Sequence, residues 1–121
     1  MTVEWTLRAQ VWEWSEDDGE ESERPAGTVE LRGVRSGVLP SRKEDIRISA
    51  ELLDAICAAV DLRPYGEETD RLKVDETLHE LSNTGLCHVV VVQLRGLKPG
   101  PTFPQRSKMF VSEHFALVRT R

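Results

Sequence analysis

The sequence has few of the features that place a protein in a membrane or cross-link it with disulfide bonds. None of its apolar runs approaches the ~18 residues of a membrane-spanning helix, and its start lacks the basic, apolar and small-residue order of a signal peptide. The two cysteines, Cys57 and Cys87, lie in apolar settings without CxxC spacing, which favours reduced thiols over a disulfide. We therefore expect a cytoplasmic protein that does not bind membranes.

Motifs that would name a reaction are also missing. The chain contains no Walker A and no GxGxxG sequence, so a phosphate-binding loop of either kind is excluded. No serine has the strand-turn-helix context of a nucleophile elbow. We therefore assign no catalytic residue and no cofactor, and favour a non-catalytic protein over an enzyme whose site is assembled from scattered residues.

Histidines are too few and too scattered to predict a metal site. His79 and Glu80 begin like a zincin motif, but Asn83 stands where the second histidine of that motif is needed. A structural zinc site needs four ligands, and nothing in the spacing of His79, His88 and His114 brings them to one ion. We expect isolated histidines and no bound metal; whether the three meet depends on the fold.

The composition is that of an ordinary globular domain. The chain has 121 residues, of which 39% are hydrophobic and 31% charged, and its mean hydropathy is −0.40. A chain of this length suits one domain, which we place at 1–121.

The net charge of −5 is concentrated in one segment. Residues 16–23 hold six acids and no base, which leaves sixteen bases against fifteen acids in the rest of the chain. Repelling charges with serine, glycine and proline bury little surface, so we predict a mobile acidic loop at 15–26. The C-terminal third is basic instead, with six bases from Arg95 onward against Glu113 alone.

The first strand is the clearest element, and it raises a question. Apolar residues occupy every odd position from Val3 to Val11, as a half-buried strand requires, yet Trp12 and Trp14 follow on the two sides of Glu13 at even positions. Exposed, the two tryptophans would form a binding platform. We favour the alternative, that other parts of the protein cover them, because tryptophan is mostly buried.

The remaining pattern predicts an α+β fold. We expect a mainly antiparallel sheet of four to five strands, with one clear helix at about 49–61 and a second, short helix at about 75–83. The helix at 49–61 is supported by its four-residue apolar spacing and by Ser49 as N-cap. A small oligonucleotide-binding-type barrel is the alternative. The expected strands are 3–14, 28–39, 44–48, 86–95 and 108–120.

Two functions fit these observations. We favour a protein-binding module, with an inhibitor or immunity-type protein as its most specific form, in which an acidic hairpin loop meets a basic partner. Its predicted binding residues are Glu16, Asp17, Asp18, Glu20, Glu21, Glu23, Trp12 and Trp14. The alternative is a protein that binds single-stranded nucleic acid through Trp12, Trp14 and the basic residues Arg95, Lys98, Arg106 and Lys108. Either protein is expected as a monomer or homodimer.

Overall fold

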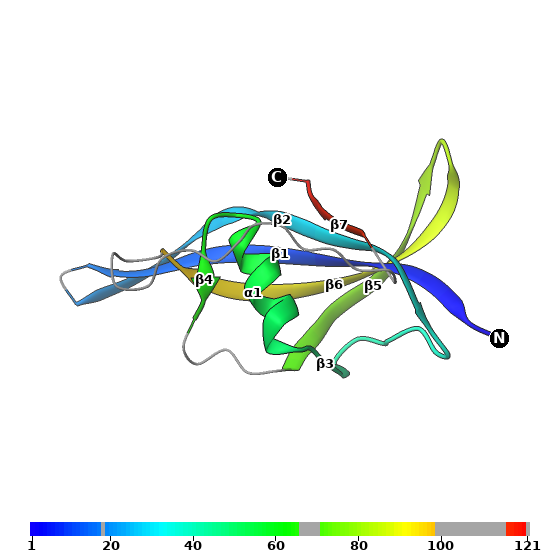
Figure 1. The fold of residues 1–121 in the computed structure, drawn as a ribbon, viewed down its shortest axis with the longest axis horizontal. Helices are drawn as coiled ribbons and strands as arrows, with labels where there is room; N and C mark the ends of the chain where they lie inside the picture. Colours follow the sequence, from blue (N-terminus) through cyan, green and yellow to red (C-terminus); the bar gives the residue numbers. More distant parts are fainter. Residues whose placement is uncertain (18, 66–70, 99–115, 121) are drawn as a thin grey trace.

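The computed structural model describes residues 1–17, 19–65, 71–98 and 116–120 (Figure 1). Their elements, in chain order, are β1 (Val3–Asp17), β2 (Glu20–Ser36), β3 (Asp45–Arg47), α1 (Ala50–Ala58), β4 (Arg63–Pro64), β5 (Arg71–Ser82), β6 (Gly85–Leu97) and β7 (Ala116–Arg119). The described part is therefore predominantly β, with one helix. Within it, no helix has the length and apolar character needed to cross a membrane.

The seven strands form one mixed sheet in the order β3-β5-β6-β1-β2-β7, and the short β4 pairs with the end of β6. All neighbouring pairs are antiparallel except β1 and β6, which run in parallel from Thr6 opposite Val89 to Glu13 opposite Gly96. The sheet is not a closed barrel, because its edge strands β3 and β7 do not pair with each other in the residues described. The predicted antiparallel character holds for every pair but this central one.

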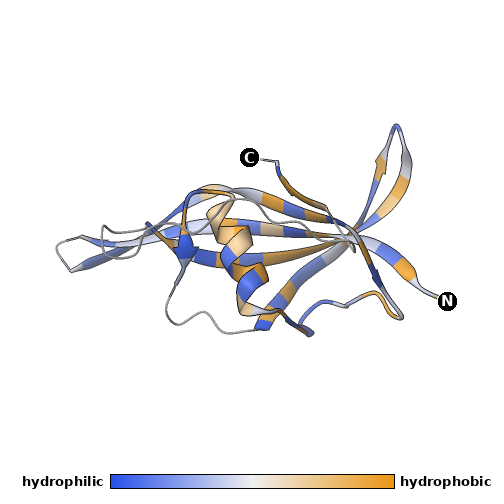
Figure 2. Ribbon diagram, viewed as in Figure 1, coloured by the Kyte–Doolittle hydropathy of each residue, from blue (hydrophilic) through white to orange (hydrophobic). Residues whose placement is uncertain are grey.

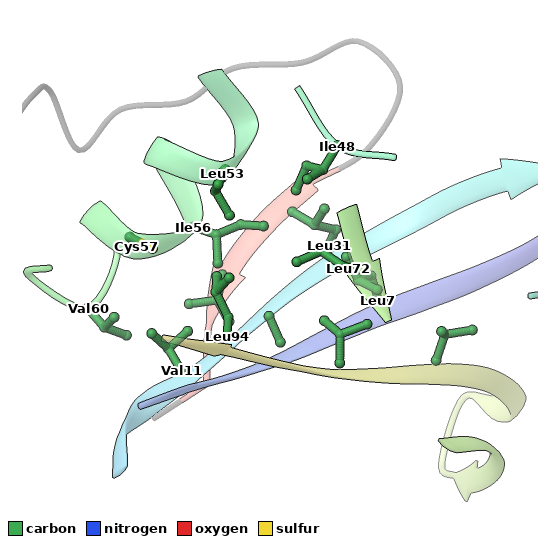
Figure 3. Close-up of a cluster of buried hydrophobic side chains, with 14 of the residues drawn as sticks. Leu7, Val11, Leu31, Ile48, Leu53, Ile56, Cys57, Val60, Leu72 and Leu94 are labelled. Atoms are coloured by element: carbon green, nitrogen blue, oxygen red, sulfur yellow. The ribbon is translucent and has the colours of Figure 1, made fainter. Parts of the chain in front are cut away.

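The core lies between one face of the sheet and helix α1. Hydrophobic residues alternate with hydrophilic ones along the central strands (Figure 2), so each strand turns one apolar side toward the helix. Leu53 and Ile56 point from α1 toward Leu72 and Leu94 of the sheet (Figure 3), and Ile56 is fully buried. The N-cap is the predicted one, since the Ser49 hydroxyl accepts a hydrogen bond from the backbone N–H of Leu52 at 3.2 Å.

The second predicted helix, at 75–83, is wrong: these residues belong to β5 and the turn that follows it. Val74, Leu78 and Leu81 have helix-like spacing, but a bulge between Val74 and Glu76 shifts the register of the strand. The shift places Leu78 and Val74 on opposite faces of the sheet. Apolar residues on the two faces of a bulged strand thus had the same sequence spacing as the apolar residues on one face of a helix.

Strands also replace the loop predicted at 15–26. β1 continues to Asp17 and β2 begins at Glu20, with Gly19 in the turn at a φ of 79°. The segment forms a two-stranded ribbon that extends beyond the helix-covered part of the sheet (Figure 1). Its mobility stays a prediction. Of the strand predicted at 108–120, Ala116–Arg119 is confirmed as β7, and 108–115 lie outside the described residues.

Candidate protein-binding site

The ribbon formed by β1 and β2 has one face that combines tryptophan with carboxylates. Residues directly opposite each other in an antiparallel pair share a face, and the register places Trp14 opposite Glu23 and Glu16 opposite Glu21. Trp12 lies two residues before Trp14 and so shares that face. We call this surface the acidic ribbon face; its residues are Trp12, Trp14, Glu16, Glu21 and Glu23.

The tip of the acidic ribbon face carries charge without compensation. Glu16 and Glu21 are exposed and directly opposite each other, an arrangement that is repulsive in a β-sheet. Glu20 is also exposed, and no ion pair with a described residue neutralises any of these three carboxylates. Asp17 lies opposite Glu20 in the backbone register, and Asp18 is outside the described residues. The tip is therefore a concentrated negative surface.

Both tryptophans are half-buried and are held in place by distant parts of the chain. The Trp12 indole Nε1–H donates to Oε1 of Gln93 at 2.6 Å, and the Gln93 amide in turn donates to Oε1 of Gln10 at 2.5 Å. The Trp14 ring lies 4.8 Å from that of Tyr65, centroid to centroid, at an interplanar angle of 50°. The rings are thus partly covered, as we favoured, and partly accessible beside the carboxylates.

On the opposite face of the ribbon, the carboxylate of Glu13 is neutralised. Glu13 is buried, and its carboxylate accepts a hydrogen bond from Nε of Arg24, while Nζ of Lys98 lies 3.7 Å from Oε1. The hydrogen bond from Arg24 lowers the pKa of Glu13; burial raises it, and Lys98 adds a smaller lowering. This face therefore offers a partner no free carboxylate at Glu13.

Of the four basic residues predicted to bind nucleic acid, the two that the structure describes are paired with carboxylates. Nε of Arg95 lies 2.8 Å from Oε1 of Glu23, and Lys98 faces Glu13, so both cations are paired with acids of the ribbon. Arg106 and Lys108 lie outside the described residues. A phosphate approaching Arg95 or Lys98 would compete with these carboxylates.

Three neighbours of the site were not predicted from the sequence: Tyr65, Gln93 and Arg24. Tyr65 lies outside every strand and helix predicted from the sequence, and Gln93 is 81 residues from Trp12 in the chain. Only Arg24 had a usable signal, because it is the one base within residues 15–26 and pairs with Glu13 across a hairpin.

The described residues form no closed metal centre at this surface. Within them, no three histidine, cysteine, aspartate or glutamate side chains gather closely enough to hold an ion. Comparisons of the chain with protein families, curated proteins and solved structures find no match.

Proposed function

We propose that the protein is a non-catalytic binding module whose acidic ribbon face binds a lysine- or arginine-rich surface of another protein. The observation that carries the proposal is the direct opposition of Glu16 and Glu21 at the tip of a ribbon that extends beyond the core. Nothing in the folding of the core requires this repulsive pair. An inhibitor of a basic protein is the most specific form of the proposal.

A cationic partner would relieve the repulsion within the free protein. Each lysine or arginine brought between Glu16 and Glu21 replaces a like-charge contact with two favourable ones. The concentrated charge also steers a basic partner during its approach, and this contribution weakens with salt.

The tryptophans add a flat aromatic surface on which a cation can stack, which carboxylates alone do not provide. A guanidinium or ammonium group that contacts the glutamates can also stack on the accessible part of Trp14, two residues from Glu16. Because Gln93 and Tyr65 already hold the two rings, little side-chain entropy is lost when a partner binds. The combination favours arginine-rich surfaces over a simple positive charge.

The test is capture from native lysate with two charge-matched variants. Glu16→Gln with Glu21→Gln removes the charges of the tip, whereas Glu51→Gln with Glu76→Gln removes the same number of charges from exposed positions off the ribbon. We expect the wild-type and the Glu51/Glu76 variant to retain a basic protein that the Glu16/Glu21 variant loses. Adding Trp14→Ala to the wild-type should weaken the same interaction.

The proposal fails if the two double variants capture the same proteins in equal amounts. It also fails if the captured material is nucleic acid, released by nuclease and by salt, because that result supports the alternative function. Binding of the purified partner should then be measured at about 0.05 and 0.15 M salt, over which the Debye length falls from about 14 to 8 Å. The affinity of the wild-type should fall more than that of the Glu16/Glu21 variant.

A further inference from the structure

The turn end of the β5–β6 hairpin bends away from the sheet, at the end of the molecule opposite the acidic ribbon (Figure 1). We call residues 79–88 the hairpin arm. In its register His79 lies directly opposite His88, and Leu81 lies opposite Leu86 on the same face, two residues nearer the turn. The two histidines that the sequence left apart are thus cross-strand neighbours.

The two imidazoles are in contact. Their ring centroids are 4.6 Å apart and the rings meet edge to face, at an interplanar angle of 68°. His79 is exposed, whereas His88 is half-buried. Nδ1 of His88 is buried and has no hydrogen-bond partner in the structure as described, an arrangement that costs free energy unless some ligand satisfies it.

We propose that His79 and His88 form a binding site for a divalent transition-metal ion of the borderline class: Zn²⁺, Ni²⁺ or Cu²⁺. Neutral imidazole is a ligand that these ions prefer, whereas Mg²⁺ and Ca²⁺ prefer oxygen. Water completes the coordination shell, because no third histidine, cysteine, aspartate or glutamate among the described residues joins the pair. This site is independent of the acidic ribbon and of the function proposed for it.

The geometry of the pair requires only a small adjustment. Two nitrogens bound to one tetrahedral zinc at about 2.0–2.1 Å lie about 3.3 Å apart, which sets the ring centroids at about 5 Å. The exposed His79 ring can rotate outward from its present 4.6 Å contact, and the backbone of a paired hairpin keeps the two Cβ atoms close.

The thiol of Cys87, next to His88 in the chain, is not a third ligand of this site, because neighbouring residues in a strand point to opposite faces. Cys87 is exposed and precedes His88, so its side chain points to the opposite face of the arm. A site that used Cys87 would therefore require a different conformation of the arm.

Calorimetric titration of the full chain with NiCl₂, ZnCl₂ and MgCl₂, together with amide NMR spectra, tests the proposal. We expect Ni²⁺ and Zn²⁺ to bind at one site and to shift the amide resonances of residues 79 and 88, and Mg²⁺ to leave both unchanged. Changing an outer neighbour of a metal ligand typically lowers affinity 10–100-fold, so His79→Asn or His88→Asn, which removes a ligand, should lower it at least about tenfold.

Two control variants separate this pair from other ligands of the chain. His114→Asn and Cys87→Ser should each bind Ni²⁺ within about twofold of the wild-type, since neither residue belongs to the pair. His79 is exposed, so its replacement leaves the fold intact, and the NMR spectrum of the metal-free variant verifies this. Binding that survives His79→Asn, or that requires Cys87 or His114, overturns the proposal.

Discussion

At the scale of single residues, two of the carboxylates that the structure describes in the sheet are nearly buried, and each is matched by two cations. Glu30 lies 2.8 Å from both Arg8 and Arg32, and Glu13 is held by Arg24 and Lys98. A charge removed from water is costly unless ion pairs and hydrogen bonds compensate it. These partners explain how glutamates can occupy positions that are only 6–7% exposed.

The contribution of Glu13 to the stability of the fold should depend on pH. The hydrogen bond from Arg24 lowers its pKa in the folded protein, so the stabilisation is present above its unfolded pKa of about 4.5 and is lost as pH falls through the lower, folded value. We expect Glu13→Gln to be less stable than the wild-type at pH 6, with the difference shrinking as pH falls below about 4.5. Urea unfolding at a series of pH values measures this.

The exposed Glu76 provides the control, because Glu76→Gln removes the same charge from a residue that is not buried. Glu80 acts in the same direction as Glu13, since the hydrogen bond from Arg8 lowers its pKa, and so the Glu13 variant will retain some acid sensitivity. A difference between Glu13→Gln and the wild-type that stays constant from pH 6 to pH 3 would contradict the assignment.

Residue positions within a strand were predictable, but their distant partners were not. Alternation correctly separated Trp5, in the core, from Trp12 and Trp14 on the other face. It also placed Glu13 on the core side, where burial of a carboxylate is unfavourable without a cation. One of its cations, Lys98, is 85 residues away in the chain, and the sequence pattern gives no sign of this pairing. Local patterns carry no information about which segments fold back on each other.

At the scale of elements, β4 approaches the backbone of β6 closely. Gly96 pairs with Pro64, and a Cβ built on Gly96 would lie 2.9 Å from both Cβ and Cδ1 of Leu62 and 3.2 Å from the carbonyl oxygen of Arg63. Only glycine therefore lets the chain after α1 lie against the sheet. Tyr65 comes directly after β4 in the chain, so the packing of β4 on β6 also determines where Tyr65 contacts Trp14.

Gly96→Ala should displace β4 and lower the free energy of unfolding by about 1–3 kcal/mol, as overpacking in a core does. The contact between Tyr65 and Trp14 should loosen with it and change the near-ultraviolet circular dichroism. Chemical unfolding of the purified variant measures the first effect.

Gly37→Ala is the matched control. A Cβ at Gly37 would have no atom within 4 Å, so this change should be neutral or slightly stabilising. Equal losses of stability in the two variants would show that glycine at 96 is not required by the packing of Leu62.

Helix α1 and the long strands with a clear apolar pattern were predicted well, and β5, whose apolar residues change face, was not. Helix α1 and strand β1 occur close to their predicted ranges because each keeps one period, and β6 does so because of its continuous apolar run at Val89 to Val92. β5 changes face at its bulge, and the two-residue β4 is too short to have a period at all. The ribbon was missed because its strands bury almost nothing, so they show no hydrophobic alternation.

At the scale of the whole molecule, the core occupies the middle and the two candidate sites lie at opposite ends. Helix α1 covers the central strands, while the acidic ribbon and the hairpin arm extend in different directions (Figure 1). The ribbon tip contributes no residue to the hydrophobic core. Its removal should therefore leave the remainder of the fold intact.

Replacing residues 16–21 with Asn-Gly joins Ser15 to Ser22, which are already cross-strand partners, through a favourable two-residue turn. We expect the free energy of unfolding to stay within about 0.5 kcal/mol of the wild-type, or to rise as the repulsion between Glu16 and Glu21 disappears. Binding of the basic partner should be lost, and nickel binding at the arm should be unchanged. A loss of stability above about 2 kcal/mol would show that the tip is structural.

The parallel pairing of β1 with β6 has a consequence for how the chain folds. β1 and β2 can form a hairpin as soon as both have been synthesised, but the other edge of β1 pairs with residues 89–96, more than eighty positions later. Until those residues leave the ribosome, a central strand of the sheet keeps an open hydrogen-bonding edge beside apolar side chains. Contacts of such sequence separation slow folding, so the nascent chain passes through a prolonged, aggregation-prone stage that ends only when β6 closes the middle of the sheet.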